Sequence, residues 1–126
     1  MIDHTKLYPE VDAKLGQLLA ALQAHGLAMH GVEGFRTRAR QDAIYAQGRT
    51  TPGPIVTHAT AEESAHCRGC AVDLCFDGGH PYVGDWQKFG ACVHSVPGLT
   101  WGGDFSTIHD YGHVEWTAWR NVPMPD

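Results

Sequence analysis

The sequence has no long hydrophobic run and no excess of positive charge. No stretch of about 18 or more consecutive apolar residues occurs in the chain, so we expect no membrane span. Nine lysines and arginines against 14 acidic residues give the 126-residue chain a formal net charge of −5. Proteins that bind nucleic acids mostly depend on a broad basic face. We therefore expect neither membrane insertion nor a nucleic-acid partner.

The sequence also shows no signal peptide and few cysteines. Its first residues, Met1 to Lys6, include no basic stretch followed by an apolar one. We therefore expect the protein to be made in the cytoplasm and its four cysteines to be reduced. Cys67 and Cys70 form a single Cys-x-x-Cys pair with no second pair to match it. Such a pair could be half of a structural zinc site or a redox pair.

Hydrophobic spacing and turn residues predict a mixture of helices and strands. The helices are predicted at about 9–25, 38–47 and 86–95, and the strands at about 27–35, 70–76, 99–101 and 112–116. Strands and helices do not alternate in a regular βαβ repeat, which favours an α+β fold. The length predicts one small domain, 1–126, which can bury a sizeable core without disulfides.

The predicted strand 70–76 has a carboxylate in its middle. Alternation places Asp73 on one face of this strand with Cys75, and Val72 and Leu74 on the other. A carboxylate in such a strand is costly to bury unless a positive group meets it. A metal ion would meet that need.

Two histidines could complete a metal site with Asp73. His66 precedes it by one turn through Gly69, and strand pairing could bring His113 to the same place. Two histidines and one carboxylate leave a fourth position open, as a catalytic zinc requires. Asp110, three residues before His113, is then a candidate general base. The alternative is that these are ordinary surface or hydrogen-bonded residues.

Several separated motifs, in the same order, resemble a known family over about residues 8–117. The family is that of the peptidoglycan-cleaving zinc peptidases, the D-alanyl-D-alanine carboxypeptidases and L-alanyl-D-glutamate endopeptidases. The matching stretches are Glu33-Gly34-Phe35-Arg36-Thr37, Gln41 to Thr57, Ser64-x-His66-x-x-Gly69-x-Ala71-x-Asp73, Trp101-Gly102-Gly103-Asp104-Phe105 and Asp110-x-x-His113-x-Glu115.

This resemblance implies a fold, a cofactor and a set of residue roles. The fold is a mainly antiparallel sheet flanked by helices, as in hedgehog and DD-peptidase domains. The cofactor is one Zn2+ per chain. By position in the family motifs, the zinc ligands are His66, Asp73 and His113, and the catalytic residues are Asp110, as acid/base, and Arg36, as the group that stabilises the oxyanion.

Three further residues are expected to bind substrate or to support the ligands. Ser64 and Trp101 fall at motif positions near the site. Glu115 shares a strand face with His113 and could orient it, although a solvated glutamate is the alternative.

The expected function is hydrolysis of peptide-stem bonds in bacterial peptidoglycan, with the L-alanyl-D-glutamate bond first. The alternatives are a D-alanyl-D-alanine carboxypeptidase or dipeptidase and a non-catalytic, zinc-bearing module that binds the cell wall. A serine hydrolase using Ser64, His66 and Asp73 is disfavoured because no Gly-x-Ser-x-Gly motif is present. We expect an endolysin-like monomer that acts on the wall, with release by a holin as one route.

Overall fold

A four-stranded sheet forms the centre of the computed structural model, which describes residues 2–125. Its strands are β1 (Met29–Glu33), β2 (Ala71–Phe76), β3 (Leu99–Trp101) and β4 (His113–Trp116). They lie in the order β1-β2-β4-β3, and every pairing is antiparallel. The predicted α+β fold with an antiparallel sheet is confirmed. The order also places β2 and β4, distant in sequence, side by side in the middle of the sheet.

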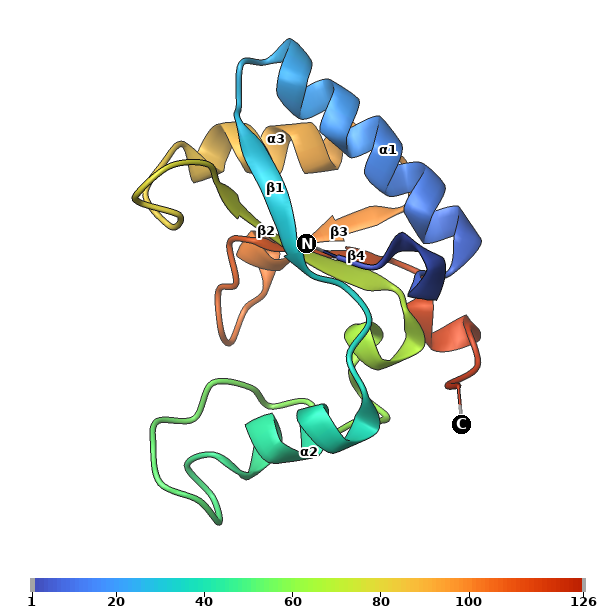
Figure 1. Cartoon of the computed structure of the whole chain (residues 1–126), viewed down its shortest axis with the longest axis vertical. Helices are drawn as coiled ribbons and strands as arrows, with labels where there is room; N and C mark the ends of the chain where they lie inside the picture. Colours follow the sequence, from blue (N-terminus) through green and yellow to red (C-terminus); the bar gives the residue numbers. More distant parts are fainter. Residues whose placement is uncertain (1, 126) are drawn as a thin grey trace.

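Two helices cover one face of this sheet, as Figure 1 shows. They are α1 (Pro9–Ala24) and α3 (Trp86–His94). The main core lies between them and the sheet, where Val72 and Leu74 of β2 meet Leu18 of α1 and Phe89 of α3. The third helix, α2 (Arg38–Ala46), lies apart at the lower end of the molecule with the long loop that follows it. The other face of the sheet is therefore left for the site.

The helices begin where the sequence predicts. Pro9 opens α1, and the side chains of Thr37 and Asp85 cap α2 and α3 by accepting hydrogen bonds from backbone N–H groups two or three residues inside each helix. Gly26, with φ of 73°, lets the chain leave α1 in a left-handed conformation. Among residues 2–125, no helix combines the length and the apolar character needed to cross a lipid bilayer.

Four short 3-10 helices were not predicted. They are η1 (His4–Lys6), η2 (Ala65–Arg68), η3 (Gly102–Asp104) and η4 (Trp119–Asn121). One turn of 3-10 helix is too short to leave a periodic pattern in the sequence. β3 has the predicted bounds, β2 and β4 each begin one residue later than predicted, and residues 27, 28, 34 and 35 lie outside β1.

Gly69, which ends η2, lies close to the backbone of Lys6. Its φ is 68°, and a Cβ atom there would lie 2.6 Å from the carbonyl oxygen of Lys6. Only glycine combines this conformation with that approach at little cost. The turn sends the chain from His66 directly into β2.

Two adjacent leucines of α1 test the packing of the core. Leu18 is fully buried, whereas Leu19 is 36% exposed. We expect Leu18→Ala to lower the free energy of unfolding by about 3 kcal/mol, because it removes core contacts and leaves a cavity. Leu19→Ala, the matched control, should cost less than about 1 kcal/mol. Chemical denaturation measures both, and equal losses would contradict the assigned core face of α1.

Candidate metal centre and its cleft

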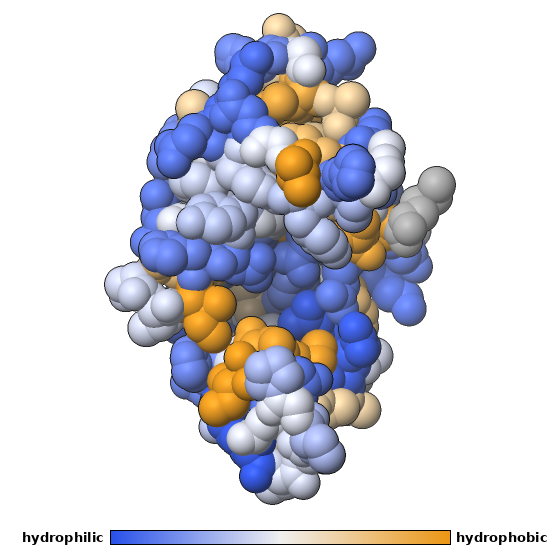
Figure 2. Space-filling model, turned by 90° about the vertical axis from the view of Figure 1, so that its left-hand side faces the viewer, coloured by the Kyte–Doolittle hydropathy of each residue, from blue (hydrophilic) through white to orange (hydrophobic). Residues whose placement is uncertain are grey.

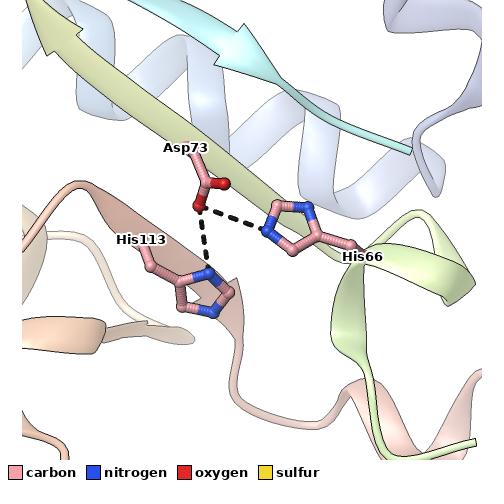
Figure 3. A group of neighbouring side chains, drawn as sticks. All are labelled: His66, Asp73 and His113. Atoms are coloured by element: carbon pink, nitrogen blue, oxygen red, sulfur yellow. Dashed lines mark hydrogen bonds and ion pairs between the residues drawn. The ribbon is translucent and has the colours of Figure 1, made fainter. Parts of the chain in front are cut away.

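Three side chains from separate elements converge on the face of the sheet that α1 and α3 leave free. Asp73 lies in the middle of β2, and the antiparallel register places it directly opposite His113, the first residue of β4. His66 comes from η2, just before β2. Figure 3 shows both imidazoles turned toward the Asp73 carboxylate. The strand pairing that the sequence only allowed is therefore present.

The convergence is close. Asp73 Oδ1 lies 3.2 Å from His66 Nε2 and 3.2 Å from His113 Nδ1. One ligand atom from each of the three residues lies within 4.8 Å of the others. Both histidines are buried, and the Asp73 side chain is 23% exposed. Three groups that bind metal ions are thus held together at the edge of solvent.

The far nitrogen of each imidazole has its own partner. His66 Nδ1 lies 2.7 Å from the carbonyl oxygen of Gly34. A carbonyl can only accept, so Nδ1 carries a proton and Nε2 is the nitrogen that faces Asp73. His113 Nε2 lies 2.7 Å from Glu115 Oε1. Such outer contacts fix which nitrogen faces a metal ion.

This donor set fits a divalent cation such as zinc. Imidazole nitrogen and carboxylate oxygen are both zinc ligands, and three protein ligands with room for a fourth are typical of catalytic sites. His66 Nε2 and Asp73 Oδ1 face one another at 3.2 Å, an arrangement that needs a positive charge there, either a proton or a cation. A cation bound by His66, Asp73 and His113 would supply that charge.

The electrostatics of the site follow from the same contacts. Burial by itself raises the pKa of Asp73, but hydrogen bonds from His113 and His66, with their charges, outweigh it and hold the pKa well below its usual range. Burial lowers the pKa of His113, yet its contacts with Asp73 and Glu115 outweigh burial and raise the pKa to about 9. Without metal, a proton on His113 therefore balances the two carboxylates.

Arg36 is held beside the three ligands. Its guanidinium donates two hydrogen bonds to Glu33, at 2.9 and 2.7 Å, and one to Gln41 at 2.8 Å. Its Nη2 also lies 3.7 Å from Asp73 Oδ2. Its backbone N–H donates to the carbonyl of His66 at 3.0 Å. The arginine is thus fixed in place before any ligand arrives.

Asp110 lies at the mouth of the site, in the loop before β4. A Cβ atom at Gly102 would lie 2.3 Å from the carbonyl oxygen of Asp110, so this close approach requires glycine. The residue is exposed as a whole, but partial burial of its carboxyl and the nearby charge of Asp73 raise its pKa. Such a carboxyl suits proton transfer.

These residues line an open cleft of about 590 Å³. One wall comes from α2 and the following loop, the other from the loop that carries Asp110, and the three converging residues form the floor. Figure 2 shows the hollow with apolar side chains along its lower edge. The apolar residues that line the cleft include Ile44, Val56, Phe105, Ile108 and Trp119. A cleft open along its length fits an extended chain.

The three supporting residues named from the sequence lie in different places. Ser64 is buried and lines the cleft. Glu115 is largely buried, with 16% of its side chain exposed, and it contacts His113 directly. Trp101 lies in the main core rather than on the cleft, and its indole N–H donates to the carbonyl of Tyr111 at 2.7 Å. Trp101 therefore touches the site only through the loop that it anchors.

Two alternative chemistries find no geometric support. All four cysteines are free thiols and are buried. Burial raises the pKa of the Cys67 thiol, and that of the Cys70 thiol to about 11, so neither is primed for redox exchange. Within residues 2–125 no hydrogen bond joins Ser64 to His66, because both nitrogens of His66 face other groups.

Sequence reasoning missed the residues that hydrogen-bond the side chains of the site and fix their positions. Glu33 and Gln41 fix Arg36, and Trp119 donates its indole N–H to Glu115 at 2.9 Å. Gln41 is 1% exposed and also donates to the carbonyl of Ala59 at 2.8 Å, which ties Arg36 to the wall of the cleft. A polar residue at a buried position of α2 carried no signal of its own. Its role depends on contacts that are distant in the chain.

The raised pKa of His113 predicts how metal uptake depends on pH. A metal ion needs the unprotonated Nδ1, so below a pKa of about 9 it must displace one proton. The apparent zinc affinity of the metal-free protein should therefore rise about tenfold per pH unit from about pH 7 to 9 and then level off. Competition with a chromophoric chelator measures it. An affinity independent of pH over that range would contradict the site.

Comparison with known sequences identifies relatives over most of the chain. The sequence model of the VanY family, described as D-alanyl-D-alanine carboxypeptidase, matches residues 4–89. The peptidoglycan L-alanyl-D-glutamate endopeptidase CwlK of Bacillus subtilis (strain 168) is 34% identical in an alignment 122 residues long, and the match covers 86% of this chain and 72% of that protein.

Solved structures show the same fold at lower identity. The L-Ala D-Glu endopeptidase ChiX of Serratia marcescens matches with a TM-score of 0.60 and 20% identity, over 90% of this chain and 83% of that one. A mutant of the vancomycin resistance D,D-pentapeptidase VanY, in complex with Zn(II), matches with a TM-score of 0.64 and 20% identity. This match covers 88% of this chain and 72% of that one. The resemblance drawn from the sequence motifs is confirmed: the chain belongs to the VanY family of D-alanyl-D-alanine carboxypeptidases and their endopeptidase relatives.

Proposed function

We propose that this protein is a zinc peptidase that cleaves the L-alanyl-D-glutamate bond in the peptide stems of bacterial peptidoglycan. The observation that carries the proposal is the convergence of His66, Asp73 and His113 on the floor of a cleft that also presents Asp110 and Arg36. The similarity to CwlK, an enzyme named for this bond, supports the choice of substrate.

The three converging residues would hold one zinc ion per chain. Bound zinc lowers the pKa of a coordinated water to about 7 and polarises a carbonyl group. Asp110 would accept a proton from the attacking water on its carboxylate and pass it to the departing amine nitrogen. Proton transfer of this kind contributes about 10²–10⁴-fold to a rate.

Arg36 would bind the carbonyl oxygen of the bond to be cut. Its guanidinium is always charged, and Glu33 and Gln41 hold it in one orientation at the cleft. A fixed positive group needs no rearrangement as negative charge develops on that oxygen, and this is the source of its stabilising effect. Ser64 lines the same cleft and would contact the peptide.

Cleavage of D-alanyl-D-alanine is the second candidate. The description of the family model favours it, whereas the identity to CwlK favours the endopeptidase. A wall-binding module without catalysis is a weaker proposal, because such a module has no need for a carboxylate at the position of Asp110.

The substrate places the action outside the cytoplasmic membrane, as the names of the cell-wall-acting relatives also suggest. We propose that the protein acts there as a monomer. Passage through a holin stays a prediction.

Two substitutions separate the role of the general base from that of a metal ligand. Asp110→Asn should retain zinc and lower turnover by about 10²–10⁴-fold, because it removes only the proton acceptor. His113→Ala should lose both bound zinc and turnover, because it removes a proposed zinc ligand. Zinc content, measured by atomic emission after gel filtration, distinguishes the two. Equal loss of zinc in both variants would contradict the assigned roles.

The products released from purified peptidoglycan decide which bond is cut. We expect peptides that begin with D-glutamate, detected by mass spectrometry, to disappear after chelation and return when zinc is added. Free D-alanine instead would assign the protein to the carboxypeptidase branch. Failure to release any soluble product from several wall types would overturn the enzymatic proposal.

A further inference from the structure

A tryptophan from the C-terminal segment, residues 117–125, lines the cleft beside the proposed metal centre. Trp119, in η4, is 3% exposed, and its indole N–H donates to Glu115 Oε2 at 2.9 Å. The other oxygen of the same carboxylate lies 2.7 Å from His113 Nε2. Trp119, Glu115 and His113 thus form one line of hydrogen bonds that ends at the position of the ion.

Two arginines hold Trp119 in place. The guanidinium of Arg120 lies 4.1 Å from the ring centroid, and that of Arg68 lies 5.2 Å from it. A cation over the face of an aromatic ring is attracted by the ring's negative face. Arg68 also donates to the carbonyl of Val122 at 3.0 Å and so fastens the C-terminal segment to η2, the element that carries His66.

The geometry gives this line of bonds a definite effect on His113. An imidazole can expose either nitrogen, and only a free Nδ1 faces Asp73. The Glu115 carboxylate keeps the proton on Nε2, provided that the carboxylate stays against the ring. A glutamate side chain has several rotamers and loses entropy when fixed in one. The indole N–H of Trp119 reduces that cost by binding the second oxygen.

We propose that Trp119 is a positioning residue for the metal centre. It acts through Glu115, and it makes the C-terminal segment part of the structure that sets the affinity of the site for its ion. This inference rests on the proposed metal site.

Trp116 provides a matched control three residues earlier. It is also a partly buried tryptophan beside the same apolar cluster as Trp119. Among the described residues, its indole N–H donates to no group of the site. Phenylalanine at either position keeps an aromatic ring and removes the N–H.

The test measures zinc affinity by chelator competition in four variants and the wild type. We expect Trp119→Phe to weaken zinc binding about tenfold, the lower end of the effect of outer contacts on metal affinity, and Trp116→Phe to leave it unchanged. Glu115→Gln should weaken binding at least as much as Trp119→Phe. The double variant, Glu115→Gln with Trp119→Phe, should bind no more weakly than Glu115→Gln alone.

A merely structural tryptophan would give a different pattern. The losses in the double variant would then add, or Trp116→Phe would weaken binding as much as Trp119→Phe, and either result would overturn the inference. Thermal unfolding of the metal-free variants checks that each one folds. Wild-type affinity in Trp119→Phe would overturn the inference alone, whereas absence of zinc binding by the wild type would overturn the proposed function with it.

Discussion

The carboxylate of Asp73, facing two imidazoles across the centre of a sheet, is the constraint to which the rest of the site is fitted. A buried negative charge in a strand is costly unless positive groups surround it. The register of β2 and β4 supplies His113 directly opposite, and the turn of η2 supplies His66. The carbonyl of Gly34 and the carboxylate of Glu115 then decide which nitrogen each imidazole presents. The nitrogen and oxygen atoms that His66, Asp73 and His113 bring together suit a cation.

One face of the sheet packs against the apolar core, and the other face carries the residues of the site. On one face, Val72 and Leu74 pack against α1 and α3, and this apolar layer sets the positions of the strands. On the other face, alternation places Asp73 in the cleft. The proposed ligands on β2 and β4 are thus fixed by rigid elements, whereas the cleft walls come from loops and α2. Side chains on rigid elements are held in a more precise geometry than side chains on loops.

Local features of the fold were predictable from the sequence, and distant contacts were predictable only in part. Helical periodicity and the caps at Thr37 and Asp85 predicted α1, α2 and α3 to within one residue. The motifs named the residues that converge on the site, but the roles assigned to them stay predictions. Trp119 gave no signal, because a tryptophan bonded to a carboxylate looks in sequence like one that packs in a core. Trp101 was named through its motif and lies in that core.

X-ray absorption at the zinc edge of the zinc-loaded protein tests the central claim most directly. The proposed ligands contribute two imidazole nitrogens and one carboxylate oxygen, so the first shell should contain only nitrogen and oxygen at about 2.0–2.2 Å. The four cysteines are buried thiols outside the converging group. A sulfur shell at about 2.3 Å would place the ion at cysteine ligands and contradict the account. A shell without sulfur, lost in His113→Ala, is the result that the account predicts.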